Sequence, residues 1–541
     1  MAVCLNTKSA LILYQELLNS EYFVDKSAII ENISKRIRTN TKYVCITKPR
    51  RFGKTSILNM LGAYFNKAYS AKEVFDKLEI SKSQKYHTYL NQYNVISLCL
   101  NNLSGKGNTY HDYIDLIKDS IINDIREAYP TLQGRKFNNI PELLTATEDE
   151  FIFLIDEWDY IFSHELYPEH QGDFLEFLRD LLKDRPYVAL TYMTGVLPIK
   201  KYSTGSALNM FKEYTMLKDP FFEEYFGFTE SEVEMLCEKQ TALSMDEIRD
   251  WYNGYQTKDG SRIYNPRSVI CALEDAACQS YWTRTGKMDE VLFFLKYNIA
   301  EVRDDVVKMV NNMAVKIDIE KEYSAGQGNP VNRKDIYAAM VIYGLLSYND
   351  GELRIPNKEL MIEFENALED DEFGYVAKLV SSSNEVLEAT LNKKGEVVAS
   401  YLHNIHNSEL PILKYNDENS LSCVVTLAYL AARNKYRVER EEKSVRSSSK
   451  AVSPLDETSR TAKSHAGKGY VDFIFYPKRK THPGIIIELK ADATPETAIA
   501  QIKEKEYSEK LRKVNVKKIL AVGINYDTRE KEHQCIIEEI D

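Results

Sequence analysis

Cysteine is scarce and scattered in this chain of 541 residues. Its eight cysteines form no CxxC pair and no cluster with histidine, so the sequence offers neither a disulfide framework nor a zinc site. No stretch comes near the roughly 18 consecutive apolar residues that span a bilayer, and the first residues become polar too early for a secretory signal. We therefore expect a cytoplasmic protein with no membrane partner and with reduced cysteines.

The size and composition exclude a single small domain and a disordered chain. A length of 541 residues exceeds one hydrophobic core, because domains average roughly 100–200 residues. With 44% hydrophobic and 28% charged residues, the composition is that of an ordinary globular protein. The formal net charge of −11 argues weakly against a surface coated in nucleic acid, but binding depends on local patches. The charge alone leaves the partner open.

Apolar runs separated by amphipathic stretches fill the region from Tyr43 to Gly195. The runs read YVCIT, NVISLCL, FIFLIDEWD and YVALTYMTG, and SILNMLGAYFNKAY between the first two has a helical pattern. Alternating strands and helices predict an α/β fold in which helices cover both faces of a parallel sheet.

The region that follows is expected to be largely helical. Between Phe228 and Ala300, segments such as TESEVEMLCEKQ have helical patterns, and WYNGY and YNPRS are turn signals. Farther on, a helix, a hairpin around Asn349-Asp350-Gly351 and a second helix predict a winged-helix-like unit. The stretch from Lys443 to Gly469 is rich in Ser, Thr, Lys and Arg, which predicts a loop or a disordered insertion.

A candidate phosphate loop follows the first apolar run, in the segment TKPRRFGKTS. Gly53 lets the backbone approach phosphate oxygens, and the amides at the start of the next helix face the anion. Lys54 would reach the β and γ phosphates, and the Thr55 hydroxyl would bind Mg²⁺. The general pattern GxxxxGK[ST] has its first glycine where this chain has Lys48, so the loop has to turn without that glycine.

In the later run FIFLIDEWD, the apolar residues are followed directly by two acids, Asp156 and Glu157. A buried strand that stops there places both carboxylates at the carboxyl edge of the sheet, beside the phosphate loop. Asp156 would hold Mg²⁺, directly or through water, and Glu157 would orient or activate the attacking water. Thr194, at the end of YVALTYMTG, could sense the γ-phosphate or could simply form a turn.

Two arginines, Arg50 and Arg51, stand between Lys48 and the glycine of the loop. They could contact phosphate, act as arginine fingers on a neighbouring subunit of a homo-oligomer, or form a solvated basic loop. The residues expected to contact the nucleotide are Arg51, Phe52, Gly53, Lys54, Thr55, Ser56, Asp156 and Thr194.

A set of ordered motifs gives this half of the chain a family resemblance. The segments YFVDKSAIIENI, KPRRFGKTS, FLIDEWD, MTGV, YFGFTESEVEML, WYNGY and YNPRSV span most of residues 20–290. They resemble the AAA-ATPase-like family that is commonly fused to a PD-(D/E)XK nuclease domain. That family usually lacks the first glycine too, so Lys48 departs from the general phosphate loop and not from the family. The resemblance implies a P-loop NTPase fold that binds ATP with Mg²⁺.

A second group of charged residues lies near the C-terminus. The segment GYVDFIFYPKRKTHPGIIIELKAD predicts two strands joined by a basic turn. Side chains alternate along a strand, so Glu488 and Lys490 point to the same face, and Asp472 on the paired strand could join them. Two carboxylates and a lysine suit phosphodiester hydrolysis, because the acids hold Mg²⁺ while the metal and the lysine polarise the water.

Helices are expected on both sides of these strands. Downstream, ETAIAQIKEKEYSEKL predicts an amphipathic helix that carries Gln501 and Lys505 in a QxxxK spacing. Upstream, ENSLSCVVTLAYLAARNKY offers Glu418 as a further metal-binding acid, or Asp417 in its place.

The order helix, strand, strand with ELK, helix and strand resembles the PD-(D/E)XK nuclease core over roughly residues 410–525, a domain-sized match. Nucleases of this kind commonly approach the first acid as GRxD, whereas this chain has Gly469-Tyr470-Val471-Asp472. That departure leaves an active nuclease and a degenerate, partner-binding fold both open.

The sequence therefore predicts three domains: a P-loop AAA-ATPase-like domain at 1–228, a helical lid and winged-helix-like linker at 229–380, and a PD-(D/E)XK nuclease-like α/β domain at 381–541. The preferred function couples ATP hydrolysis to a Mg²⁺-dependent nuclease that acts on nucleic acid, with DNA as the first expectation. The expected catalytic residues are Glu157, Asp472, Glu488 and Lys490, and the expected metal ligands are Thr55, Asp156, Glu418, Asp472 and Glu488. The alternatives are a nucleotide-dependent switch with a degenerate nuclease domain, and a scaffold with neither activity.

Overall fold

The computed structural model describes the whole chain except residues 1–2, 104–108, 200–206, 218, 220, 258–259, 283–293, 295–299, 320–322, 328–329, 331, 369–382, 407–417, 441–471, 480, 505–506 and 541. The loop expected between Lys443 and Gly469 lies outside the described residues. Two compact units make up the chain, residues 1–299 with 314–363, and residues 300–313 with 364–541. The three domain boundaries expected from the sequence stay predictions. Among the helices that are described, none is long and apolar enough to cross a membrane.

The sheet of the first unit is parallel, as predicted. Its order is β2-β3-β4-β1-β5, and each pair of neighbours runs parallel. β1, β3 and β4 are buried along their whole length, so both faces have to be covered by helices. Because β4 lies between β1 and β3, the carboxyl ends of these three strands meet. The strands are β1 (Tyr43–Thr47), β2 (Asn94–Cys99), β3 (Phe151–Asp156), β4 (Val188–Gly195) and β5 (Lys212–Tyr214).

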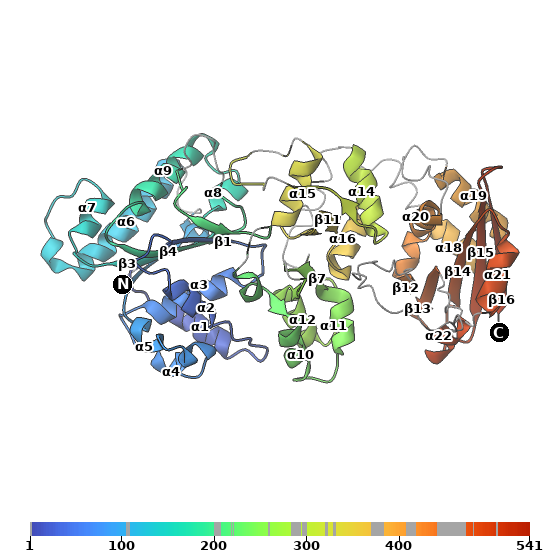
Figure 1. Cartoon of the computed structure of the whole chain (residues 1–541), viewed down its shortest axis with the longest axis horizontal. Coiled ribbons are helices and arrows are strands. Elements are labelled where there is room, and N and C mark those ends of the chain that lie inside the picture. The colour runs from blue at the N-terminus through green and yellow to red at the C-terminus, as the bar shows by residue number, and fades with distance from the viewer. Residues whose placement is uncertain are drawn as a thin grey trace, which may run out of the picture. The chain divides into compact units, whose positions relative to one another are not determined.

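Helices cover both faces of this sheet (Figure 1). The first layer packs its apolar side chains on one face and consists of α6 (Tyr110–Ala128), α7 (Ile140–Thr145) and α9 (Gln171–Leu182). The other face carries α1 (Ser9–Leu18) and α3 (Lys54–Phe65). At Gly62 a Cβ atom would lie 2.8 Å from Cβ of Ala10 and 3.3 Å from Cδ1 of Leu154, so this glycine lets α1 and the sheet close on α3. Shorter helices are α2 (Ile29–Ser34), α4 (Lys72–Phe75), α5 (Tyr86–Tyr89) and α8 (Tyr160–Ser163).

Short, well-capped helices follow, which confirms the predicted helical region. Thr229 and Ser244 each form a capping box with an acid three residues later, and Asn265 caps a helix that begins at Pro266. These side chains satisfy amides that a helix start leaves unpaired. The elements are β6 (Phe228–Thr229), α10 (Glu230–Cys237), α11 (Met245–Tyr252), β7 (Asn253–Gln256), β8 (Arg262–Tyr264) and α12 (Pro266–Asp275).

The winged-helix-like order of elements is also confirmed. The hairpin turns at Asp350 and Gly351, whose φ values are 47° and 79°, as a two-residue type I′ turn requires. The elements are β9 (Val315–Lys316), α15 (Arg333–Ile342), β10 (Ser347–Asn349), β11 (Glu352–Arg354) and α16 (Lys358–Leu368). β9 pairs with β11 and completes a three-stranded sheet.

The second unit contains a mixed sheet with helices on both faces. Its order is β12-β13-β14-β15-β16, and only β14 and β15 run parallel among these described strands. Ile485, Ile487 and Leu489 face α18, α19 and α20, whereas Ile486 faces α21 and α22. The strands are β12 (Tyr436–Arg440), β13 (Phe473–Pro477), β14 (Gly484–Ala491), β15 (Ile519–Asp527) and β16 (Glu532–Ile540). The helices are α14 (Ala300–Val310), α18 (Ser383–Leu391), α19 (Gly395–His406), α20 (Glu418–Ala428), α21 (Pro495–Glu504) and α22 (Ser508–Lys513).

Candidate active sites

The loop between β1 and α3 turns through two left-handed residues. Arg51 has φ 70° and Gly53 has φ 85°, and Gly53 is the N-cap of α3. A Cβ atom on Gly53 would meet no described atom within 4 Å, so glycine is favoured here for its backbone conformation and not for space. Residues Gly53 to Ser56 line a cavity, and the positive end of the α3 dipole favours an anion there.

Lys54 points into the bend of its own loop. Its ammonium donates to the carbonyl oxygens of Lys48 at 2.8 Å and Pro49 at 2.7 Å. Burial lowers the pKa of Lys54 to about 8, although acids nearby, Asp159 first among them, act in the opposite direction. A buried ammonium gains more from an anion than from neutral carbonyls, so Lys54 is well placed to exchange them for phosphate oxygens.

Thr55, Asp156 and Thr194 come together at the carboxyl ends of the three central strands. The Thr55 hydroxyl donates to Oδ2 of Asp156 at 2.7 Å, and the Thr194 hydroxyl donates to Oδ1 of the same carboxylate. Asp156 and Thr194 are buried. A hydroxyl and a carboxylate in contact are oxygen ligands of the kind that Mg²⁺ prefers. The residues therefore fit a magnesium ion held by Thr55 and Asp156, with Thr194 fixing the carboxylate.

Glu157 follows in an unusual backbone conformation. Its φ is 50°, a left-handed value that is uncommon for a residue other than glycine and that recurs at functional sites. Its amide donates to Oδ1 of Asp156 at 3.1 Å, and its side chain lines the same cavity as Lys54. Burial raises the pKa of Glu157, and the charge of Asp156 adds to the effect. A raised pKa suits a carboxylate that accepts a proton.

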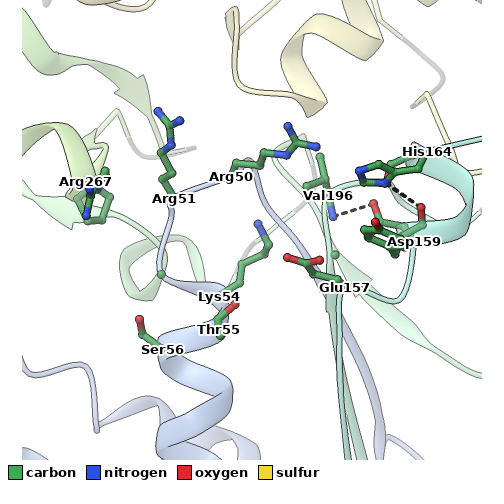
Figure 2. A pocket seen from close by; sticks show the side chains of 15 residues that line it. Arg50, Arg51, Lys54, Thr55, Ser56, Glu157, Asp159, His164, Val196 and Arg267 are labelled. Atoms are coloured by element: carbon green, nitrogen blue, oxygen red, sulfur yellow. Dashed lines mark hydrogen bonds between the residues drawn. The ribbon is translucent and has the colours of Figure 1, made fainter. Parts of the chain in front are cut away.

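The cavity over the loop has a volume of about 390 Å³. Figure 2 shows Lys54 and Glu157 facing one another across it. Of the residues expected to contact the nucleotide, five line it: Arg51, Gly53, Lys54, Thr55 and Ser56. Asp156 and Thr194 lie beneath these, while Phe52 is buried and packs edge-on against Tyr255. Phe52 does not line this cavity.

The cavity lining includes residues that the sequence motifs did not mark as candidates, among them Asp159 and Arg267. Asp159 is buried and accepts hydrogen bonds from the amides of Val196 at 3.1 Å and Leu197 at 2.7 Å, so it fixes the chain that leaves β4. Arg267 lines the cavity from the first turn of α12. The sequence signal for Arg267 is the NPRS segment, which predicts a turn. Asn265 and Pro266 are in fact the cap and first residue of a helix.

A second, apolar pocket adjoins the first. Its volume is about 110 Å³, and it shares Gly53, Ser56 and Pro266 with the larger cavity. Aromatic and aliphatic side chains dominate its lining, among them Tyr22, Val24, Phe52, Ile57, Phe228 and Ile270. Flat, weakly polar groups bind well in such surroundings. The pair of pockets thus suits a ligand with an anionic end and a ring-shaped end.

In the second unit, Glu488 contacts Lys490, and Asp472 reaches the strand that carries both residues. Oδ2 of Asp472 accepts a hydrogen bond from the amide of Leu489 at 2.7 Å, which brings this carboxylate to the strand that carries Glu488. Nζ of Lys490 lies 2.8 Å from Oε1 of Glu488. The side-chain amide of Gln501, on α21, donates through Nε2 to the same oxygen. The two-residue strand period thus predicted the shared face correctly.

Other residues expected at this site lie only partly within the described part of the chain. Glu418 begins α20, but its side chain is not described, and Asp417 and Lys505 lie outside the described residues. Tyr507, which the sequence did not single out, is buried next to the site. Burial raises the pKa of this phenol, and the charges of Glu488 and Asp472 add to it.

The second site offers two carboxylates, Asp472 and Glu488, to a metal ion. Within the described part of the chain, no group of three or more His, Cys, Asp or Glu side chains is arranged to hold one. Mg²⁺, however, is usually bound through one or two carboxylates and keeps several waters. Asp472 and Glu488 therefore suffice in kind and number for Mg²⁺, but not for a metal that demands a full protein cage.

Two family models match this chain. One, described as a predicted AAA-ATPase, matches residues 12–204, and the other, described as the PD-(D/E)XK nuclease superfamily, matches residues 460–535. The chain thus combines an AAA-ATPase-like domain with a PD-(D/E)XK nuclease superfamily domain, which confirms the fusion predicted from the motifs.

The individual proteins that resemble this chain share low sequence identity with it. An uncharacterized protein in the vnfD 5' region of Azotobacter chroococcum mcd 1 is 27% identical over 282 residues, which are 49% of this chain and 51% of the relative. The chain thus spans about half the length of that relative. The Walker-type ATPase PABY2304 of Pyrococcus abyssi is 14% identical, with 63% of this chain and 94% of that one covered and a TM-score of 0.31. The Aeropyrum pernix ORC2 protein is 11% identical, with 64% of this chain and 94% of that one covered and a TM-score of 0.25. These TM-scores are low, and neither likeness supports an inference about function.

Proposed function

We propose that this fusion of an AAA-ATPase-like and a PD-(D/E)XK domain hydrolyses ATP and cleaves phosphodiester bonds in nucleic acid, with DNA as the substrate of choice. The observation that carries the ATPase half is the junction of Thr55, Asp156 and Thr194 beside Lys54. Two strands, β3 and β4, and the start of α3 contribute to it, and each residue type matches a need of a bound nucleoside triphosphate with Mg²⁺.

The nucleotide would lie across both pockets of the first unit. Its phosphates meet the amides at the start of α3 and the ammonium of Lys54, and Arg267 is within the same cavity. Its base enters the apolar pocket beyond Gly53 and Ser56. This arrangement supports binding of a nucleoside triphosphate over free phosphate, because the apolar pocket adds burial of a ring to the charge contacts.

Hydrolysis then follows from the position of Glu157. Its carboxylate orients a water molecule and accepts a proton from it, while the water oxygen forms a bond to the γ-phosphorus. The bond from the γ-phosphorus to the bridging oxygen breaks, and ADP and phosphate leave. When bound by Thr55 and Asp156, Mg²⁺ would neutralise charge on the phosphate oxygens. Thr194 keeps the Asp156 carboxylate turned toward Thr55 through its hydrogen bond.

Two variants test the ATPase assignment. Lys54→Ala should abolish ATP binding, because it removes the ammonium that lies nearest the start of α3. Glu157→Gln should retain ATP but hydrolyse it slowly, because it keeps size and hydrogen bonding and loses the proton acceptor. Binding is measured by calorimetry and turnover by phosphate release. Tight binding by Lys54→Ala, or parental turnover by Glu157→Gln, would move these roles to other residues.

The phosphodiesterase half rests on the contact of Lys490 with Glu488 and on the reach of Asp472 to the same strand. Mg²⁺ held by Asp472 and Glu488 would activate a water and neutralise charge on the scissile phosphate. Lys490 adds a positive charge where negative charge develops. Gln501 holds the Glu488 carboxylate from α21.

One assay separates this function from its alternatives. Purified protein is incubated with single- and double-stranded DNA and RNA, with and without ATP and with Mg²⁺ or EDTA. We expect cleavage of DNA that requires Mg²⁺. ATP turnover without cleavage of any substrate would favour a nucleotide-dependent switch whose C-terminal domain binds a partner. Absence of both activities would favour a scaffold.

A further inference from the structure

The three basic residues that precede Gly53 have three different surroundings. Lys48 is buried and paired with Asp219. Arg51 donates through Nη1 to the carbonyl oxygens of Tyr281 at 3.3 Å and Trp282 at 2.7 Å. Its guanidinium also lies 5.6 Å from the centre of a Trp282 ring. Lys48 and Arg51 thus hold neighbouring segments of the chain, and their positive groups are engaged away from the phosphate site.

Like Arg51, Arg50 lines the 390 Å³ cavity, together with Lys54, Glu157 and Arg267, but its side chain takes a different direction. In Figure 2 its side chain extends over Lys54 and Glu157, toward Val196, whereas Arg51 points away from Lys54. Arg50 therefore lines the part of the cavity in which the γ-phosphate of a bound nucleotide would lie.

We propose that Arg50 contacts the γ-phosphate bound to its own chain and stabilises the charge that develops there during hydrolysis, so that the site needs no arginine from a second chain. The proposal rests on the ATPase function proposed above. As the water oxygen bonds to the γ-phosphorus and the bridging oxygen departs with ADP, negative charge spreads over the γ-phosphate oxygens and the leaving group. A guanidinium stays charged at every relevant pH and offers paired donors that match two phosphate oxygens.

The backbone explains how Arg50 and its neighbour come to face different ways. Arg51 has a left-handed backbone with φ 70°, which turns the chain sharply between the two side chains. Arg51 is held on the far side by Tyr281 and Trp282, whose amides are in turn held by Glu359 at 2.6 Å and 2.8 Å. Because Arg51 is held by these contacts, the loop keeps its conformation and the Arg50 side chain stays over the cavity. Arg50 therefore lies at the nucleotide site of its own chain.

The first test compares ATP turnover with nucleotide affinity. Arg50→Ala should lower kcat by about 10²–10³-fold, the loss seen when one donor to developing charge is removed. Affinity for ADP, which lacks the γ-phosphate, should change by less than about threefold, whereas affinity for a non-hydrolysable ATP analogue should fall by about tenfold or more, as expected for a charged hydrogen bond. Arg50→Lys should lie between, because it restores the charge without the paired donors. Arg135→Ala, at an exposed arginine of the same unit, is the matched control and should behave as the parent.

The outcomes separate this proposal from the function on which it rests. A parent protein that binds and hydrolyses ATP, with an Arg50→Ala variant that keeps its kcat and its preference for the triphosphate analogue, would overturn the role of Arg50 alone. A parent that binds no nucleotide would overturn the ATPase function and this role with it. Equal loss of ADP and analogue affinity in a folded variant would show a role in holding the loop, and would also overturn the phosphate contact.

The second test distinguishes action in cis from action in trans. Arg50→Ala and Lys54→Ala proteins are mixed, and turnover of the mixture is compared with the sum of the two alone. If Arg50 served a neighbouring chain, the Lys54→Ala protein would supply it to the intact Lys54 of the other variant, and activity would return. We expect no gain on mixing, and parental turnover per chain that does not change when the protein is diluted. Activity restored by mixing would overturn the assignment in cis.

Discussion

Lys48 and Asp219 form a buried ion pair with 2.9 Å between Nζ and Oδ2, and their side chains are only 4% and 0% exposed. Lys48 also donates to the carbonyl oxygen of Thr215 at 3.1 Å. Asp219 accepts hydrogen bonds through Oδ1 from the amides of Phe221 and Phe222. Where the general phosphate loop has glycine, this chain therefore has a side-chain anchor that ties the loop to the segment after β5.

The first prediction concerns this pair. Lys48→Met leaves the Asp219 carboxylate buried without its cation, and should lower the free energy of unfolding of the first unit by about 3–5 kcal/mol. Urea denaturation followed by tryptophan fluorescence measures the change. Lys67→Met is the control, because Lys67 and Asp149 form an exposed pair at 3.3 Å, and such pairs contribute about 0–1 kcal/mol.

A double variant makes the argument sharper. Lys48→Met with Asp219→Asn leaves no unpaired charge, and the amide oxygen can still accept from Phe221 and Phe222. This variant should regain much of the stability that Lys48→Met loses. If it proves less stable than Lys48→Met alone, the ion pair is not the reason for the loss.

The second prediction concerns the glycine at the end of β4. A Cβ atom on Gly195 would lie 2.6 Å from Cδ1 of Trp158 and would also overlap Asp159, and both neighbours are buried. Gly195→Ala should therefore displace the cavity wall, lower unfolding free energy by about 1–3 kcal/mol and reduce ATP turnover. Gly172→Ala is the control, because α9 has room for that Cβ among the described atoms, and alanine favours a helix. Parental turnover in Gly195→Ala would contradict the close packing.

The third prediction concerns the carboxylate that holds the chain beside Arg51. Glu359 is buried and accepts hydrogen bonds from the amides of Tyr281 and Trp282 and from the hydroxyl of Ser268. Glu359→Ala should cost about 1–3 kcal/mol for each buried amide left unpaired, and should weaken ATP binding because Arg51 loses its fixed support. Thermal unfolding and calorimetry measure the two effects. A stable variant with weak binding would indicate a local role, whereas unchanged values for both would contradict the contact.

The buried Glu359 carboxyl should also make the free energy of unfolding depend on pH. Burial raises the pKa of this carboxyl, so the folded state binds its proton more readily than the unfolded state does. Its contribution to stability is full below the unfolded pKa of about 4.3 and is lost as the pH rises through the higher folded pKa. Glu359→Gln removes this titration. The stability of the parent relative to that variant should fall with rising pH in this window, and a rise would contradict the sign.

The fourth prediction concerns the second unit. Asp472→Asn, Glu488→Gln and Lys490→Ala should each lose most cleavage, because each removes a metal ligand or the charge beside it. ATP hydrolysis should survive, since its residues lie in the first unit. Glu439→Gln, at a half-exposed acid of β12, is the control and should cleave as the parent does. Cleavage that persists in all three variants, or in EDTA, would rule out this site.

The motifs in the sequence were informative where the chemistry is local. The spacing in GKTS predicted the start of α3 at the phosphate loop, and the two-residue strand period predicted that Glu488 and Lys490 share a face. The hairpin at Asp350 and Gly351 followed from turn chemistry. In the NPRS segment, the same kind of reasoning identified a turn and missed the cap of α12, because Asn and Pro serve turns and helix starts alike.

The sequence by itself determined the secondary structure around each motif and the residue types that each site contains, because hydrophobic period, caps and turn residues act over a few positions. Tertiary structure decided which of them face the ligand. It placed β4 between β1 and β3, so that Thr194 reaches Asp156, and it brought Asp219, Tyr281 and Trp282 to the phosphate loop. Lys48, Arg50 and Arg51 look alike in the sequence, and only their long-range surroundings distinguish them: Lys48 is buried against Asp219, Arg51 donates to Tyr281 and Trp282, and Arg50 lines the cavity.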